Sequence, residues 1–235
     1  MKRSDFRYRE SRSNPSNNMY LMKMIWGLQP CWNSRTCRKV ANAGAYCGCA
    51  IPVTDNSIDA KAIKPSDVIQ SYSGKTIEVI DTDAEGRLIL ADGLSYLVRN
   101  YNPDVLIDAA TLTGSAVRTF GFHAGALFSN NENLANQLLS ASEKTTERLW
   151  RLPLWDSYAD EIKSDVADVR NLSMRPTAGA ISAAKFLEVF TDNHTCWAHM
   201  DIAGVCLQDS EFTSQKSATG FGPRLLTTFM ENYQP

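Results

Sequence analysis

The sequence predicts an α/β fold, with a mixed, largely parallel β-sheet flanked by helices on both faces. Three observations support this prediction. From residue 51 onward, short apolar or β-branched runs alternate with stretches of helical period. Each apolar run is short enough to be a buried strand. The composition agrees, because 43% of the 235 residues are hydrophobic and 21% are charged, as in an ordinary globular protein.

The first regular segments lie between residues 76 and 114. Residues 76–80 (TIEVI) are β-branched and predict a strand. Apolar residues then recur every three or four positions from Leu88 to Tyr101, which predicts an amphipathic helix. Residues 104–110 (DVLIDAA) have the apolar run of a buried strand and end in the loop TLTG, residues 111–114. In sheets of this kind, ligands bind at the carboxyl ends of the strands.

The alternation continues to the end of the chain. Residues 123–130 predict a strand, and Asn131 is expected to cap a helix over residues 132–150. The small residues within 177–191 suit close helix packing. The remaining predicted elements are helices at 153–164, 177–191 and 222–233 and a strand at 196–205.

The chain changes character near residue 50, since residues 1–49 show no sustained helical or strand period. Residues 1–40 carry nine Lys or Arg against two acidic residues, a net charge of +7. A basic arm can bind nucleic acid, but charge is its only support, so we expect an irregular leader and no nucleic-acid partner. Four of the six cysteines lie within residues 31–49, at spacings unlike the paired knuckles of structural zinc sites.

Several classes of protein are disfavoured by absent patterns. No apolar run is long enough to span a membrane, and the basic N-terminus lacks the apolar region of a secretory signal, so a cytoplasmic protein is expected. The sequence SGKT at 73–76 lacks the upstream glycine of a phosphate loop. Neither a G-x-S-x-G nor an H-E-x-x-H motif occurs. His199 lies in an apolar strand and is expected to be structural.

The stretch DTDAEGRL, residues 81–88, places three carboxylates and a guanidinium at alternate positions. On an extended segment, Asp83 and Glu85 would share a face with Arg87 beside them. Two adjacent carboxylates repel unless a cation lies between them, and Mn(II), Mg(II) and Zn(II) accept such ligands. Arg87 can hold an oxyanion. The alternative is a solvated loop whose acidic residues favour the positive end of the following helix, and spacing alone does not decide.

This stretch resembles NTDAEGRL, the signature of the leucyl (cytosol) aminopeptidase family, with Asp81 in place of the Asn. The preceding segment, IPVTDNSIDAKAIKPSDVIQSYSGKTIEV, also resembles the family. The segments that resemble it after the motif are DAATLTG, LFSNN, RLWRLPLWDSY, ADVRNL, TAGAISAAKFLEVF and WAHMDIAGV. The resemblance covers residues 50–232 and implies the C-terminal catalytic domain of that family.

The resemblance implies a metal-dependent aminopeptidase that releases N-terminal residues such as leucine from peptides. It implies two divalent metal ions, manganese or zinc, with Asp83 and Glu85 among the ligands. Arg87 is implied to be catalytic, holding a bicarbonate that acts as base. The implied substrate-binding residues are Thr111, Leu112, Gly114 and Ala203. Family members usually form homohexamers, so the expected partners are a peptide substrate and further copies of the chain.

The beginning of the chain departs from the family pattern. Residues 15–24 (PSNNMYLMKM) resemble the link between two family segments and fix a register. In that register, Lys2 falls on a ligand lysine. Other essential positions are replaced, by Arg7, Asn14 and Ile25. We therefore expect residues 1–49 to be a degenerate remnant of the start of the catalytic domain, and residues 50–235 to be the domain itself, incomplete and without the family's N-terminal domain.

A change of reading frame is one explanation for the departure. The codons GAT ATG GGG encode Asp-Met-Gly, and the same bases read one position later can encode Ile-Trp-Gly, the sequence of residues 25–27. In this explanation the reading frame returns near Cys49. Translation of the nucleotide sequence in all frames tests whether residues 25–49 arose this way. The second hypothesis for the chain is therefore a catalytically inactive fragment or pseudoenzyme that keeps part of the fold.

Overall fold

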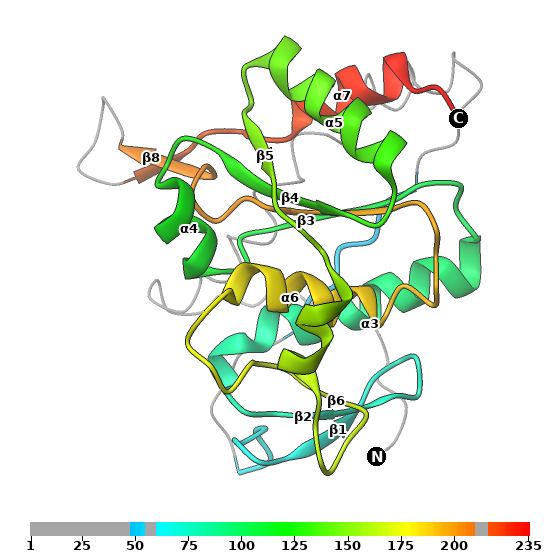
Figure 1. The fold of residues 1–235 in the computed structure, drawn as a ribbon, viewed down its shortest axis with the longest axis vertical. Helices are drawn as coiled ribbons and strands as arrows, with labels where there is room; N and C mark the ends of the chain where they lie inside the picture. The colour runs from blue at the N-terminus through cyan, green and yellow to red at the C-terminus, as the bar shows by residue number, and fades with distance from the viewer. Residues whose placement is uncertain (1–47, 55–59, 210–215) are drawn as a thin grey trace.

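The computed structural model describes residues 48–54, 60–209 and 216–235. At its centre lies a four-stranded sheet of order β3-β7-β4-β5 (Figure 1). Its strands are Leu106–Ala110 (β3), Trp197–Asp201 (β7), Gly125–Ser129 (β4) and Leu149–Arg151 (β5). β3 is parallel to β7 and β4 is parallel to β5, whereas β4 and β7 are antiparallel. The carboxyl ends of β3 and β7 therefore meet at one edge of the sheet, and those of β4 and β5 at the opposite edge.

Two smaller sheets flank the central one. Strands Val68–Gln70 (β1), Thr76–Glu78 (β2) and Val169–Arg170 (β6) form a sheet in which β1 is antiparallel and β6 parallel to β2. Strands Leu207–Asp209 (β8) and Lys216–Ala218 (β9) pair antiparallel. The predicted α/β class with mixed sheets and flanking helices is confirmed, although the described strands divide among three sheets rather than one.

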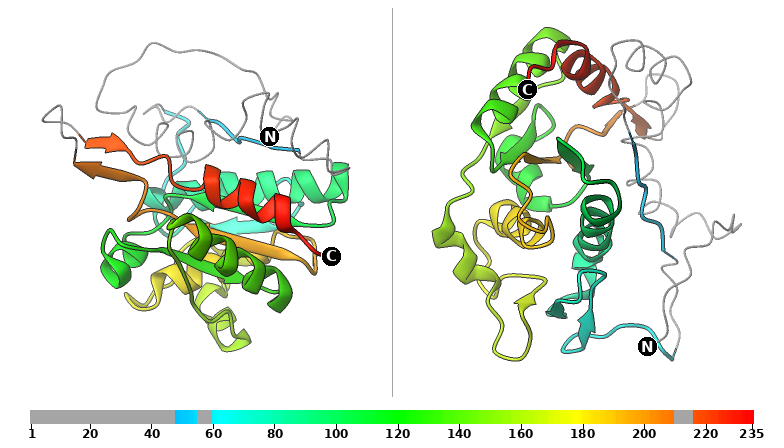
Figure 2. Two further views of the ribbon diagram at one scale, coloured as in Figure 1. Left: turned by 90° about the horizontal axis from the view of Figure 1, so that it is seen from above. Right: turned by 90° about the vertical axis from the view of Figure 1, so that its right-hand side faces the viewer.

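Helices cover both faces of the central sheet (Figures 1 and 2). Helices Glu132–Thr145 (α5) and Pro223–Asn232 (α7) lie on one face. Helices Glu85–Tyr101 (α3) and Gly179–Glu188 (α6) lie on the other. The shorter helix Gly114–Phe120 (α4) follows β3, and two 3-10 segments are Thr82–Ala84 (η2) and Asp156–Ile162 (η3).

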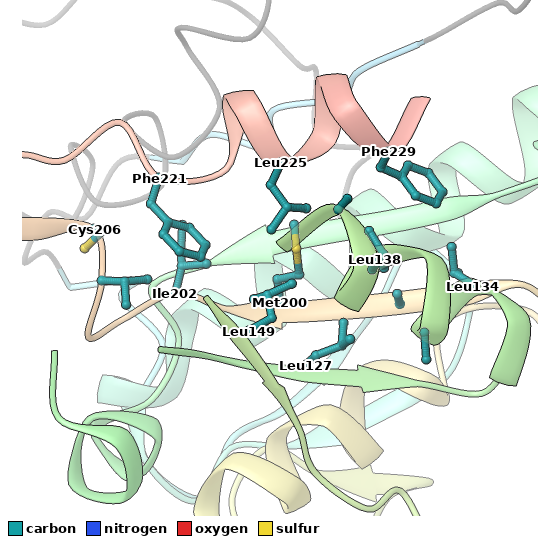
Figure 3. Packing of buried hydrophobic residues seen from close by; sticks show 14 residues of the cluster. Leu127, Leu134, Leu138, Leu149, Met200, Ile202, Cys206, Phe221, Leu225 and Phe229 are labelled. Carbon is teal, nitrogen blue, oxygen red and sulfur yellow. The ribbon is translucent and has the colours of Figure 1, made fainter. Parts of the chain in front are cut away.

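The core beneath α5 and α7 is shown in Figure 3. Leu127 and Met200 from the sheet meet Leu138 from α5 and Leu225 from α7, and all four side chains have an exposed fraction of 0%. On the opposite face, Trp197 packs with α3 and α6. β7 thus buries both of its faces, as expected of a central strand. Each such buried side chain stabilises the fold by about 1.5–3 kcal/mol.

The predicted packing of the small-residue helix is confirmed. Ala180 and Ala184 of α6 are buried against Ala126 and Phe128 of β4. At the start of the same helix, a Cβ on Gly179 would lie 2.4 Å from the Ser115 hydroxyl of α4. The close approach of α6 to its neighbours therefore depends on residues with little or no side chain.

Most predicted elements occur, and the differences have local causes. Asn131 caps α5 as predicted, with its side chain accepting from the Leu134 amide at 2.9 Å. The helix ends at Thr145 rather than near residue 150, because Thr146 adopts a left-handed conformation and the chain then enters β5. The helix predicted at 153–164 is the 3-10 segment η3. β1, β5, β6, β8 and β9 are too short to leave a periodic signal.

Some predictions concern residues whose structure is not described. Lys2, Arg7, Asn14 and Ile25 lie outside the described residues, as does the basic segment 1–40. The proposed boundary at residues 49 and 50 falls close to where the described part begins. Across the described ranges, no helix combines the length and the apolar content needed to cross a membrane.

Candidate active site

The motif at residues 81–88 forms the entry to helix α3. Asp81 caps η2, because its side-chain oxygen accepts from the Asp83 amide at 2.9 Å. α3 then begins at Glu85, which places this carboxylate in the first helical turn. The extended conformation considered for this stretch is therefore wrong. A capped helical turn takes its place, and the negative charge of Glu85 favours the positive end of α3.

Arg87 is buried under this turn, with an exposed fraction of 5%. Its Nη1 donates to the backbone oxygen of Asn171 at 2.8 Å. Its Nε is also buried and has no hydrogen-bond partner among the described residues. Burial lowers the pKa of Arg87 to about 10, although the charges of Asp201, Glu85 and Asp81 oppose the shift. The guanidinium therefore stays charged at neutral pH and keeps a buried donor for an anionic or carbonyl group.

The loops that follow β3 and β7 are joined by one carboxylate. Asp201, at the end of β7, pairs with Ala110 at the end of β3 and is 1% exposed. Its Oδ1 accepts from the amides of Leu112, at 3.1 Å, and Ala203, at 3.2 Å. Its Oδ2 accepts from the Thr113 hydroxyl at 2.6 Å. Two segments implied to line a substrate cleft therefore have their backbones fixed by the same side chain.

The motif lies against these loops. A Cβ on Gly86 would be 3.5 Å from Leu112 Cδ1, so the first turn of α3 contacts the TLTG loop. The negative charge of Asp201 also raises the pKa of Arg87, against the effect of burial. The described residues thus bring Arg87, Leu112 and Ala203 into one region at the carboxyl ends of β3 and β7.

The other implied site residues lie around this region in different environments. Thr111 directly follows β3 and is half-buried. Gly114 is the first residue of α4 and is exposed, and a Cβ there would be 3.4 Å from Arg118 Nη1. Asp83 is exposed and Glu85 is half-buried.

Comparison with known proteins places the chain in a family. Residues 31–227 match the model of the cytosol aminopeptidase family, catalytic domain. The chain belongs to the cytosol aminopeptidase family. A probable cytosol aminopeptidase of Chlorobium phaeobacteroides is 51% identical over 183 residues, which are 78% of this chain and 36% of that protein. The probable cytosol aminopeptidase of Chloroherpeton thalassium is 50% identical over 184 residues, with the same coverage.

A third relative, the probable cytosol aminopeptidase of Desulforapulum autotrophicum, is 46% identical over 187 residues, or 79% of this chain and 36% of that protein. The aligned part of the chain thus spans about a third of the length of the curated relatives that it matches. The family model begins at residue 31, inside the segment expected to be a degenerate remnant. The match to the cytosol aminopeptidase family is thus to its catalytic domain.

Cytosol aminopeptidases are metallopeptidases, so the donor set of this member matters. The described residues contain no group of three or more His, Cys, Asp or Glu side chains able to hold a metal ion. Asp83 and Glu85 are present, but Lys2 lies outside the described residues. Two carboxylates and a buried arginine do not by themselves fit a complete two-metal centre. Of the metal ligands that the resemblance implies, Asp83 and Glu85 are the two that lie in the described part of the chain.

His199 is buried, as expected for a residue of an apolar strand. It is 0% exposed, its Nδ1 bonds to Asp108 Oδ1 at 2.5 Å, and its ring stacks on Phe128. Burial lowers the pKa of His199, but the charge and hydrogen bond of Asp108 together with the charge of Asp201 raise it, and the net shift is upward. The Nε2 atom has no hydrogen-bond partner among the described residues. Asp108 also accepts from the Trp197 indole at 2.9 Å, so this network ties β3 to β7 beneath the site.

One cavity in the described part of the chain lies away from this site. It has a volume of about 510 Å³ and is lined by residues that include Ser129, Arg151 and Trp155. Ser129 and Arg151 end β4 and β5, whose carboxyl ends lie at the sheet edge opposite Ala110 and Asp201. The cavity therefore lies at the other edge of the central sheet from Ala110 and Asp201.

Two residues of the site region were not predicted. Asp201 could have been found, because a lone carboxylate at the carboxyl end of a buried strand is a candidate functional residue in an α/β sheet. Asn171 lies in ADVRNL, which was noted only as part of the resemblance. Its contacts join residues 84–91 positions apart in the chain, and no local pattern in the sequence signals them.

Proposed function

We propose that this protein is a metal-dependent aminopeptidase that hydrolyses the first peptide bond of peptides and releases N-terminal residues such as leucine. One observation carries the proposal. In a member of the cytosol aminopeptidase family, the motif arginine, Arg87, lies beside the loops of Leu112 and Ala203 at the carboxyl ends of adjacent parallel strands. This is where α/β sheets bind their ligands.

The described side chains supply orientation and charge in this proposal. Asp201 holds the backbones of Leu112 and Ala203, so the walls of the substrate cleft are fixed before a peptide binds. Thr111 and Gly114 extend the same wall. Arg87 presents a buried, permanently charged guanidinium whose Nε is available to an anion or to the oxygen that gains charge during hydrolysis.

The proposal includes the metal ions and the bicarbonate that the family resemblance implies. Asp83 and Glu85 are proposed as ligands of manganese or zinc, Lys2 as a further ligand, and Arg87 as the residue that holds bicarbonate. Such ions, when bound, supply an activated water and polarise the peptide carbonyl. Because the donor set of the described residues is incomplete, metal content is the decisive measurement.

The remaining proposals concern surroundings and partners. The relatives are named cytosol aminopeptidases, which supports a cytoplasmic location for this protein. Assembly into a homohexamer is proposed from the resemblance, and light scattering coupled to size-exclusion chromatography measures it directly. Peptides are the proposed substrates.

The test is hydrolysis of leucine p-nitroanilide by the full 235-residue chain with added Mn(II), together with metal analysis of the purified protein. We expect activity and bound divalent metal in the unchanged chain. Glu85→Ala removes a proposed ligand and is expected to abolish both. The matched control is Glu143→Ala, which removes an exposed carboxylate of α5 and should leave both intact.

The result also separates the two hypotheses for the chain. The proposed function would be refuted if the protein is folded by circular dichroism but contains no metal and has no activity. The chain would then be explained as an inactive fragment. Activity that survives Glu85→Ala would show that the motif is not the site.

A further inference from the structure

We propose that Asn171 is the positioning residue of the site: its side-chain amide takes the place of a peptide group and holds the motif turn, and its backbone oxygen holds Arg87. Asn171 directly follows β6 and has an exposed fraction of 0%. The inference rests on the proposed function in one respect, namely that the motif at 81–88 is the catalytic centre.

The side chain extends the parallel pairing of β2 and β6. The last paired residues are Glu78 and Arg170, and the backbone N–H of Asn171 still donates to the backbone oxygen of Glu78 at 2.9 Å. Beyond that point the backbones separate. The Asn171 Oδ1 then accepts from the Ile80 amide at 2.7 Å, and its Nδ2 donates to the Asp81 oxygen at 2.7 Å. A carboxamide has the donor and acceptor of a peptide group, so it satisfies backbone groups that would otherwise be buried without partners.

The same residue reaches both ends of the motif. Its Nδ2 also lies 3.4 Å from the oxygen of Ala84, the residue before α3. Its backbone oxygen accepts from Arg87 Nη1 at 2.8 Å. This hydrogen bond orients the guanidinium, whose Nε has no partner among the described residues. Asn171 thus fixes the turn that carries Asp83 and the direction in which Arg87 points.

No other common side chain combines these properties in the same volume. Aspartate has the same size but, when ionised, cannot donate to the oxygens of Asp81 and Ala84. Alanine loses both the donor and the acceptor and leaves a cavity. These two variants therefore separate the contribution of the amide donor from that of packing.

The matched control is Asn130→Ala. Asn130 also bridges two backbone groups, with Nδ2 donating to the His194 oxygen at 2.6 Å and Oδ1 accepting from the Trp197 amide at 2.9 Å. It lies beyond β4, at the sheet edge opposite the motif. Loss of its bonds should affect stability without affecting the motif.

The experiment uses the full chain and two measurements at pH 8, amide hydrogen exchange by mass spectrometry and leucine p-nitroanilide kinetics. For Asn171→Ala and Asn171→Asp, we expect amide hydrogen exchange within residues 79–88 to be roughly tenfold faster than in the unchanged chain. This factor corresponds to the net stabilisation by about one hydrogen bond. We expect kcat to fall about 10²-fold, as for a misplaced catalytic group, with KM nearly unchanged. Asn130→Ala should show neither effect.

The outcomes distinguish this inference from the proposed function. If the unchanged chain is inactive and holds no metal, the proposed function fails, and the exchange data alone judge whether Asn171 fixes the motif. Wild-type exchange within residues 79–88 in Asn171→Asp would overturn the role of the amide. Faster exchange spread over the whole chain, or a loss of kcat matched by Asn130→Ala, would reduce Asn171 to a general contributor to stability.

Discussion

Replacement of Asp201 by alanine tests how the two loops of the site are held. The variant leaves three donors without their acceptor: the amides of Leu112 and Ala203 and the hydroxyl of Thr113. Asp201 is 1% exposed, so water does not readily replace it. Arg87 also loses a nearby opposite charge. A buried group left unsatisfied costs about 1–3 kcal/mol, and removal of one partner of a buried charged network costs about 3–5 kcal/mol.

We therefore expect Asp201→Ala to lower the free energy of unfolding by about 4 kcal/mol, or Tm by about 8–16 °C for a domain of this size. Asp201→Asn keeps an acceptor for the two amides and should lose only about 1–2 kcal/mol. Urea denaturation followed by circular dichroism measures both values. The control is Asp168→Ala, whose exposed carboxylate accepts from the Thr76 amide and hydroxyl at 2.7 and 2.8 Å, and the expected loss is smaller because water replaces it.

Equal losses for Asp201→Ala and Asp168→Ala would refute the reasoning, because burial would then make no difference to these bonds. A loss for Asp201→Asn as large as that for Asp201→Ala would place the effect in the charge near Arg87 rather than in the loop amides.

Three further predictions concern stability. Gly204→Ala should lower the free energy of unfolding by about 1–3 kcal/mol, because a Cβ at this position would lie 2.2 Å from the backbone oxygen of Gly121. Thermal denaturation measures the loss, and an unchanged Tm would contradict the prediction. Leu138→Ala truncates a side chain with an exposed fraction of 0% and should lower the free energy of unfolding, measured in urea, by about 2–5 kcal/mol. Leu139→Ala truncates the half-buried neighbouring side chain and should lower it clearly less. Hydrogen bonds from the neighbouring strand lower the pKa of Asp168 below its ordinary 3.8, so its stabilisation is complete above that pH and lost as pH falls through the lowered pKa. In Asp168→Asn, the free energy of unfolding should therefore fall less steeply as the pH is lowered below 3.8. An unchanged pH dependence would contradict a lowered pKa at Asp168.

Local patterns in the sequence predicted much of the fold. Periodicity over residues 88–101 predicted α3, and the apolar run at 104–110 predicted β3. Asn131 marked the start of α5, since a cap acts on the amides within the next helical turn. These elements depend on neighbouring residues along the chain. The short strands β1, β5, β6, β8 and β9 were missed because two or three residues show no detectable period, whereas β2 was predicted from the β-branched residues of TIEVI.

The site was predictable in its residue types more than in its geometry. The alternate charges of DTDAEGRL suggested an extended segment, but Asp81 caps a helical turn and Glu85 starts a helix. Resemblance supplied the roles of Asp83, Glu85 and Arg87, and these roles stay predictions. Nothing in the spacing of the motif indicated that Arg87 is buried or that its pKa is lowered.

The sequence by itself determined the family, the main helices and strands, and which residues carry charge near the motif. Only the tertiary structure decided that Asn171 holds the motif turn and that Asp201 joins the loops of Leu112 and Ala203. The physical reason is that these hydrogen bonds link groups distant in sequence, and only the packing of the sheets and helices brings them within 3 Å or so of each other. A buried amide or carboxylate looks like any other polar residue until the backbone groups that it satisfies are known.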